Sequence, residues 1–275
     1  MQLLYHSEVR WLSKGRILTR LYELRHEVRE FLESKHHQLA SYYFDNIHLA
    51  KLAYLADIFE HLNVLNSSMQ GTKLTVFQFA DKIEAFKRKV GMWSRKVKHG
   101  NIQMFHRVSD FLEDLAEVDI TSDVSEHLDK LSTKLIHYFP EDPRRGNLWI
   151  LNPFAVSSDS SEVKLSEILL EELLQLSEDS TMRVTFNMKE LIAFWIYAKN
   201  EYPCLAKAAI KFLLPFSTTY LCESGFSGVA HIKIKERNRL ATGLVCACLR
   251  LSFTTIHIQP QLDEIISRKQ PQVLH

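Results

Sequence analysis

The chain has 275 residues, of which 46% are hydrophobic and 24% are charged. This is ordinary globular composition, and it excludes a disordered chain, a collagen and a mucin-like stalk. The formal net charge is only +1. The chain as a whole therefore lacks the strongly basic balance that is typical of nucleic-acid-binding domains, and any binding charge must be local.

The start of the chain and its cysteines indicate a soluble intracellular protein. Residues 1–11 lack the apolar run of a signal peptide, and the longest uncharged apolar stretch, residues 191–198, is too short to span a membrane. The four cysteines lie in the last third, and the single residue between Cys246 and Cys248 is not the spacing of a structural zinc site. We expect reduced thiols, no membrane partner, no metal and no cofactor.

The first half of the chain is predicted to be helical, because no proline precedes Pro140. Hydrophobic residues recur at threes and fours over residues 9–35 and again over residues 41–66. A third helix is predicted from a heptad-like seam, with Thr75 and Gln78 as a capping box at its start. The seam consists of Phe79, Ile83, Phe86, Val90, Trp93 and Val97. A fourth helix carries the stripe Val124, Leu128, Leu131, Leu135 and Tyr138.

The amino-acid composition changes over residues 141–161, which are rich in proline, glycine, asparagine and serine. This composition predicts a linker. An acidic helix is predicted around residues 165–176. Pro203 fits the first turn of a further helix, which should end before Pro215. We interpret Trp93, Trp149 and Trp195 as core residues, because each lies on an apolar stripe or beside apolar neighbours.

Charge is concentrated in two neighbouring blocks of opposite sign. Residues 82–107 contain eight Lys or Arg against one Glu, a local charge of +7, whereas residues 110–142 contain ten acids against two Lys, a local charge of −8. One interpretation of the basic block is a phosphate-binding face formed by Lys87, Arg88, Lys89, Arg95 and Lys96. The alternative is that the basic helix packs beside the acidic one or is a solvated face.

Three segments resemble one protein family. Leu214-Pro-Phe-Ser-Thr-Thr-Tyr-Leu-Cys-Glu-Ser-Gly-Phe-Ser227, followed by Lys233-Ile-Lys-Glu-Arg-Asn-Arg-Leu240, resembles the C-terminal block of hAT-superfamily DNA transposases and the host genes derived from them. Arg10-Trp11-Leu12-Ser13 resembles the segment that opens their helical insertion domain. Trp149-Ile-Leu-Asn-Pro-Phe154 is similar to a segment of the domesticated branch that includes the BED-zinc-finger and SCAN-domain transposon-derived proteins.

The resemblance implies a mainly α fold: a helical insertion-domain bundle plus C-terminal helices left from an RNase H-like transposase fold, without its catalytic sheet. The corresponding boundaries are a helical insertion-like domain over 1–140, a linker over 141–161 and a C-terminal hAT dimerisation region over 162–275.

The resemblance also implies that this chain is not an enzyme by itself. Glu223 matches the last carboxylate of the Asp-Asp-Glu set that clamps two divalent ions in active members. The two aspartates of that set come from strands upstream of the Arg-Trp segment, and the chain begins only ten residues before Trp11. We therefore interpret Glu223 as a remnant, a capping or surface acid.

Two further roles follow from the resemblance. Trp11 matches an aromatic residue that helps to hold distorted DNA, for which the alternative is an anchor of the first helix. The C-terminal region would pair with a second protomer, for which the alternative is a purely internal core. The predicted interface residues are Phe194, Trp195, Ile210, Leu213, Phe226 and Leu249.

The resulting hypothesis is a non-enzymatic, transposase-derived interaction module that forms homodimers, or dimers with hAT-derived relatives, and keeps residual DNA binding. A second hypothesis is an enzyme remnant that is active only with a full-length transposase partner. A third is a decayed transposon copy without a selected function. The family implies a nuclear location, with the cytoplasm as a further location.

Overall fold

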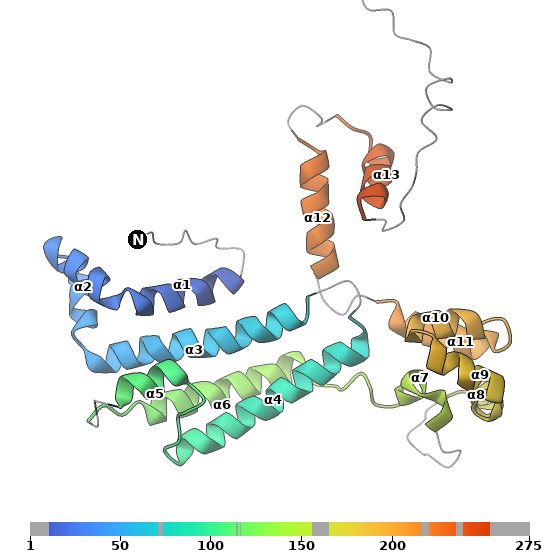
Figure 1. Ribbon diagram of the computed structural model, residues 1–275, viewed down its shortest axis with the longest axis horizontal. Helices are drawn as coiled ribbons and strands as arrows, with labels where there is room; N and C mark the ends of the chain where they lie inside the picture. The colour runs from blue at the N-terminus through green and yellow to red at the C-terminus, as the bar shows by residue number, and fades with distance from the viewer. Residues whose placement is uncertain are drawn as a thin grey trace, which may run out of the picture. The chain divides into compact units, whose positions relative to one another are not determined.

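The computed structural model describes residues 11–70, 74–113, 115, 117–155, 165–215, 220–234 and 239–253. These residues are mostly α-helical and include no strand, which confirms the predicted mainly α fold class. The chain divides into two compact units, residues 1–218 and residues 219–275 (Figure 1). The origin of the C-terminal helices in an RNase H-like fold stays a prediction.

The first group of helices in the larger unit surrounds one hydrophobic core, the first core. Helix α1 packs along α3, α4 packs along α6, and α5 packs on α3 (Figure 1). Tyr54, Trp93 and Phe105 meet edge to face or nearly so at its centre, with ring centroids 5.0 and 5.8 Å apart for the two pairs that include Phe105. The elements are α1 (Trp11–Glu23), α2 (Arg25–Ser34), η1 (Gln38–Tyr43), α3 (Asn46–Ser68), α4 (Val76–Lys98), α5 (His106–Leu112) and α6 (Thr121–Tyr138).

Helix α4 follows the predicted seam closely. Its start is the predicted capping box: the Gln78 N–H donates to the Thr75 hydroxyl at 3.3 Å, and the Thr75 N–H donates to the Gln78 side-chain oxygen at 3.0 Å. Phe79 is only partly buried and contacts the Phe139 ring. The other seam residues are buried: Ile83, Phe86, Val90, Trp93 and Val97.

The limits of two predicted helices are wrong. The first predicted helix is divided at Leu24, whose side chain is buried while its backbone leaves helical geometry (ψ 17°). The second begins at Asn46 instead of residue 41, because the Asp45 carboxylate accepts the Ile47 N–H at 2.8 Å and caps the helix there. The fourth helix does extend to Tyr138 as predicted, but the Tyr138 side chain is exposed and does not belong to the buried stripe.

The remaining helices of the larger unit form a second core that is rich in aromatic residues. Trp149 and Trp195 meet edge to face with ring centroids 5.6 Å apart, and the Trp195 indole N–H donates to the Ile150 carbonyl at 2.9 Å. Phe77 of α4 also joins this core and contacts Phe212. The elements are α7 (Leu148–Leu151), η2 (Pro153–Ala155), α8 (Glu167–Glu178), α9 (Ser180–Met188), α10 (Leu191–Ala198) and α11 (Pro203–Leu213).

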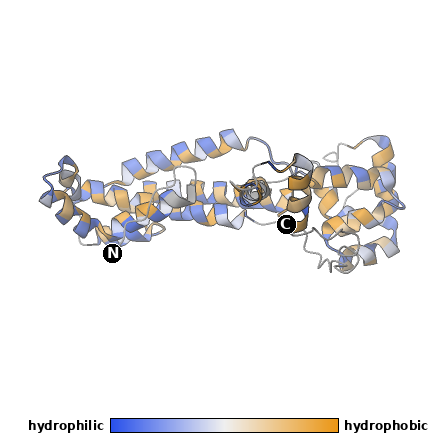
Figure 2. Cartoon of the chain, turned by 90° about the horizontal axis from the view of Figure 1, so that it is seen from above, coloured by the Kyte–Doolittle hydropathy of each residue, from blue (hydrophilic) through white to orange (hydrophobic). Residues whose placement is uncertain are grey.

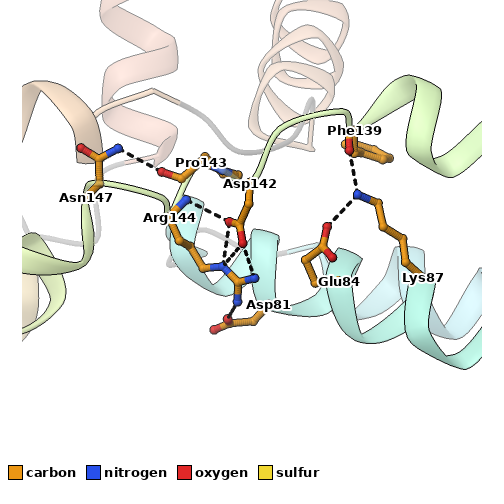
Figure 3. Close-up of polar contacts among 8 residues, drawn as sticks. All are labelled: Asp81, Glu84, Lys87, Phe139, Asp142, Pro143, Arg144 and Asn147. Atoms are coloured by element: carbon orange, nitrogen blue, oxygen red, sulfur yellow. Dashed lines mark hydrogen bonds and ion pairs between the residues drawn. The ribbon is translucent and has the colours of Figure 1, made fainter. Parts of the chain in front are cut away.

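The predicted linker contains a packed segment. Residues 148–155 form α7 and η2 and contribute buried side chains to the second core, whereas residues 156–161 lie outside the described part of the chain. The stretch before α7 is fastened to α4 by polar contacts (Figure 3). Arg144 pairs with Asp142 at 2.6 Å and with Asp81 of α4 at 2.5 Å. These carboxylates raise the pKa of Arg144, and the Arg144 guanidinium in turn lowers the pKa of Asp142.

The smaller unit contains α12 (Tyr220–Ile232) and α13 (Thr242–Phe253), which pack against each other (Figure 1). We refer to them as the C-terminal hairpin. Among its described residues only Val245 is buried. The hairpin therefore has almost no core of its own.

Candidate interaction surfaces

The outer face of α4 carries an exposed group of cations, the basic face, formed by Arg88, Lys89, Arg95 and Lys96. The spacing i, i+1, i+7, i+8 gives two pairs on one side of the helix, separated by about 10.5 Å along its axis. None of the four side chains forms an ion pair with a described residue. Their charge is therefore available to a partner.

Three other cations of the basic block, Lys87, Lys98 and Arg107, form ion pairs within the chain. The Lys87 ammonium donates to Glu84 at 2.6 Å and to the Phe139 carbonyl at 2.7 Å (Figure 3). Lys98 pairs with Asp129 of α6 at 2.8 Å, and this cation is the first cause that lowers the pKa of Asp129. Helix α4 thus does pair with the acidic helix, as the alternative predicted, whereas phosphate binding by the four outward-facing cations stays a prediction.

One group of side chains in the first core has the composition of a metal site. Asp57, Glu60 and His106 bring their ligand atoms close together. However, Arg107 donates to Asp57 at 2.8 Å and to Glu60 at 2.5 Å, and the Val108 N–H donates to the second Asp57 oxygen at 3.2 Å. The guanidinium lowers the pKa of Glu60 and supplies the positive charge that a cation would bring. We assign this group to folding.

Helix α10 is apolar on every side. Its inner residues Phe194, Trp195 and Ala198 are fully buried in the second core, whereas Ile192, Ile196 and Tyr197 are exposed on its outer face. A helix that is hydrophobic all round normally has a partner on each side. Figure 2 shows how rich this part of the chain is in hydrophobic residues. We define Ile192, Ile196 and Tyr197 as the α10 outer face.

The predicted interface residues lie in different environments. Phe194 and Trp195 are not available to a second protomer in this arrangement, because their side chains are enclosed by the core of their own chain. This corrects the prediction at these two positions. Leu213 is also buried, and Ile210 is partly buried against the same core. In the hairpin, Leu249 is half-buried and Phe226 is 74% exposed.

Two residues with roles implied by the resemblance are placed only by their backbone. Trp11 begins α1, and Glu223 lies in α12. Their side chains lie outside the described part of the structure, so the roles of both residues stay predictions. The α10 outer face is the feature that sequence reasoning missed, although the uninterrupted apolar run of residues 191–198 was a usable signal for it.

Comparison with known proteins gives two matches. Residues 1–98 match the FAM200/GTF2IRD2 helical domain, and residues 165–253 match the hAT family C-terminal dimerisation region. The second match includes α10 and the hairpin. No solved structure matches the chain. No helix among the described residues is both long and apolar enough to cross a membrane.

Proposed function

Because this chain is an hAT transposase-derived protein that carries the C-terminal dimerisation region of that family, we propose that it acts as a domesticated, non-enzymatic module that pairs with a second copy of itself. The observation that carries this proposal is the α10 outer face, which leaves Ile192, Ile196 and Tyr197 in solvent. Pairing would cover these side chains, and each half-exposed isoleucine contributes about 1 kcal/mol when it is covered.

Light scattering coupled to size exclusion, at low and at high salt, tests the proposal. We expect a dimer of twice 32.1 kDa at both salt concentrations, since apolar contacts are not screened. Ile196→Glu should shift the chain towards the monomer. The matched control is Ile136→Glu on α6, because Ile136 is 57% exposed, Ile196 is 58% exposed, and only Ile196 lies in the dimerisation region. A monomeric wild-type chain, or equal effects of the two variants, contradicts the proposal.

A second candidate function is binding to the phosphate backbone of DNA through the basic face of α4. The observation in its favour is the set of four exposed cations without ion-pair partners among the described residues, since such cations release counterions from nucleic acid. Replacing Arg88, Lys89, Arg95 and Lys96 by Gln should reduce the slope of log K against log salt by about 3.6.

The matched control for DNA binding is Lys98→Gln on the same helix. Lys98 is already paired with Asp129, so its removal should change the salt slope little. Lys87, which the sequence placed among the phosphate-binding residues, should behave like Lys98, because Glu84 and the Phe139 carbonyl hold its ammonium. Equal effects of paired and unpaired cations would reject the basic face as the binding surface.

The absence of catalysis is part of the proposal and has its own test. In the alternative, a relative that carries the two aspartates of the Asp-Asp-Glu set supplies them, and this chain supplies Glu223. Mixing the two with Mg²⁺ or Mn²⁺ should give no additional DNA cleavage. Cleavage that is restored by the mixture and then lost with Glu223→Ala would establish the enzyme-remnant hypothesis instead.

We also propose a nuclear location, which fits DNA binding. Imaging of the tagged chain tests it, and purely cytoplasmic protein would count against it. Regulated endogenous protein in cells is expected of a domesticated module, whereas its absence would favour the decayed-copy hypothesis.

A further inference from the structure

The outer side of α2 carries three acids without partners. Glu27, Glu30 and Glu33 are exposed, and none of them forms an ion pair with a described residue. They follow one another at steps of three residues, so they lie within an arc of about 120° and extend over about 9 Å along the helix axis. Phe31, which is 61% exposed, follows Glu27 at i+4 and lies beside it. We refer to these four residues as the acidic face.

The two arginines of α2 do not neutralise the acidic face. The Arg25 guanidinium lies over the Tyr22 ring, 4.6 Å from its centroid, and the Arg29 guanidinium lies over the Phe44 ring, 5.3 Å from its centroid. Such cation–π contacts hold each arginine on its ring. Both arginines are half-buried, whereas the acids are exposed. Helix α2 thus keeps its cations on the inner side and its acids on the outer side.

The basic face of α4 has a similar size and the opposite charge. Its four cations also lie within an arc of about 120°, and they extend over about 12 Å along the helix axis. Met92, which is 37% exposed, lies at their centre, three or four residues from each of them. Each face therefore combines unpaired charges of one sign with one exposed apolar side chain. A methionine thioether packs favourably on an aromatic ring such as that of Phe31.

The two faces leave each other unpaired within one chain. Helix α2 packs against α1 and η1, whereas α4 packs along α6. A second copy can supply the cations that α2 lacks and the acids that α4 lacks. Both faces lie within residues 1–98, outside the stretch of residues 165–253 that matches the dimerisation region.

We propose that the acidic face of one copy binds the basic face of a second copy, at an interface separate from the dimerisation region. The contact joins unlike surfaces, so it can link dimers into larger assemblies. Exposed ion pairs contribute little each and are screened by salt. The contact therefore requires low salt and a protein concentration well above that at which the dimer forms, and in dilute solution the dimer remains the largest species.

This contact has a consequence for the basic face. A copy whose basic face is occupied by α2 of another copy cannot use the same cations for a polyanion, so DNA and the acidic face compete. The contact itself depends neither on DNA binding nor on dimerisation, because it uses only side chains of α2 and α4.

Zero-length cross-linking of carboxylates to amines tests the contact directly. Unlabelled and ¹⁵N-labelled full chains are mixed, treated with a carbodiimide and digested, so that links between copies combine both isotopes. We expect such mixed links from the acids of α2 to Lys89 or Lys96, with a yield that falls at least about fivefold between about 0.05 and 0.5 M salt. Lys134, an exposed lysine of α6, is the control amine. Equal yields at Lys134, or no mixed link at low salt, overturn the proposal.

Charge reversal provides the second test. The acidic-face variant carries Glu27→Lys, Glu30→Lys and Glu33→Lys, and the basic-face variant carries Arg88→Glu, Lys89→Glu, Arg95→Glu and Lys96→Glu. At high protein concentration and low salt, neither variant alone should form assemblies beyond the dimer, because its two faces have charges of the same sign. Light scattering of an equimolar mixture should show such assemblies again. A mixture of the folded variants that stays dimeric rejects the pairing of the two faces.

The two tests distinguish this inference from the proposed function. A monomeric wild-type chain in dilute solution contradicts the proposed dimer, but the mixed links of the wild type still decide whether the two faces meet. Conversely, a stable dimer without mixed links rejects the contact and leaves the proposed dimer intact. The cross-links of the wild type require no variant, so they decide the proposal even if a charge-reversed chain does not fold.

Discussion

The two cores of the larger unit are built differently. The first core contains all the buried polar residues of the described chain, namely Asp57, Ser94 and Ser125, and the outside of its helix α4 is basic. The second core is apolar and aromatic within, and its helix α10 is apolar outside as well. Helix α4 of the first core is thus apolar inside and basic outside, whereas α10 of the second core is apolar on both sides.

This difference indicates what each region can recognise. A buried pair such as Asp57 with Arg107 has to satisfy its hydrogen bonds within the chain, so it fixes one arrangement of α3 and α5. An apolar outer face imposes no such geometry and contributes energy only when another apolar surface covers it. The proposed DNA binding rests on the exposed cations of α4, and the proposed self-association rests on the α10 outer face.

The largest predicted effect contrasts the two sides of α10. Trp195→Ala should lower the free energy of unfolding by about 4 kcal/mol, because it removes a fully buried ring together with its hydrogen bond to Ile150. Ile196→Ala, one residue further on, should cost less than about 1 kcal/mol in the monomer. Urea titration at a concentration where the chain is monomeric measures both. Equal losses would show that α10 is buried on both sides within one chain.

The next effect tests the buried polar contacts of the first core. Asp57→Ala should lower the free energy of unfolding by about 3 kcal/mol, since it leaves the Arg107 guanidinium and the Val108 N–H without their buried partner. Glu60→Ala removes only the exposed partner of the same arginine and should cost less than about 1 kcal/mol. Urea titration of both variants measures these losses of stability. A larger loss for Glu60→Ala than for Asp57→Ala would mean that Asp57 is not the residue that holds α5 on α3.

A smaller effect is expected in the pH dependence of the free energy of unfolding, and it arises from His127 in the first core. Burial lowers the pKa of His127 below its ordinary value of 6.5, and Lys130 and Lys134 lower it further. The ring shares a 2.8 Å hydrogen bond with the buried Tyr54 hydroxyl of α3. Because the unfolded chain takes up this proton first, the stabilisation due to neutral His127 is complete above pH 6.5 and is lost as the pH falls below it.

The measurement is the free energy of unfolding at pH 7.5 and 5.5 for the wild type and for His127→Gln. The wild type should lose more stability on acidification than the variant, and the difference isolates His127 from the other histidines. If the two chains lose the same amount, the ring does not stay neutral in the folded state.

Local cues made α4 predictable from the sequence. The seam from Ile83 to Val97 repeats over several turns, and the Thr75–Gln78 box lies next to the turn that it caps. Both signals act between neighbours in the chain, so no tertiary information is needed to find them. The same holds for Pro203, which stands in the first turn of α11 as predicted.

The features that the sequence could not predict depend on distant partners. Trp149 was correctly interpreted as a core residue, but the segment around it was assigned to a linker, because its packing depends on Trp195, about 45 residues away. The engagement of Lys87 depends on the carbonyl of Phe139. In α10 every residue is apolar, so periodicity cannot separate Phe194 and Trp195 from their exposed neighbours.

The smallest predicted effect concerns two helical glycines with opposite surroundings. Gly15→Ala should destabilise the chain, because the added methyl group would meet the Asn63 side chain where α1 packs on α3. At Gly91 of α4 the nearest atom to an added Cβ would be an Arg95 guanidinium nitrogen at 3.8 Å, an ordinary contact. Gly91→Ala should therefore raise the free energy of unfolding by up to about 1 kcal/mol. Thermal unfolding measures both changes. A loss of stability at Gly91 would show that the outer side of α4 is covered by protein, and the basic face would then be closed to DNA.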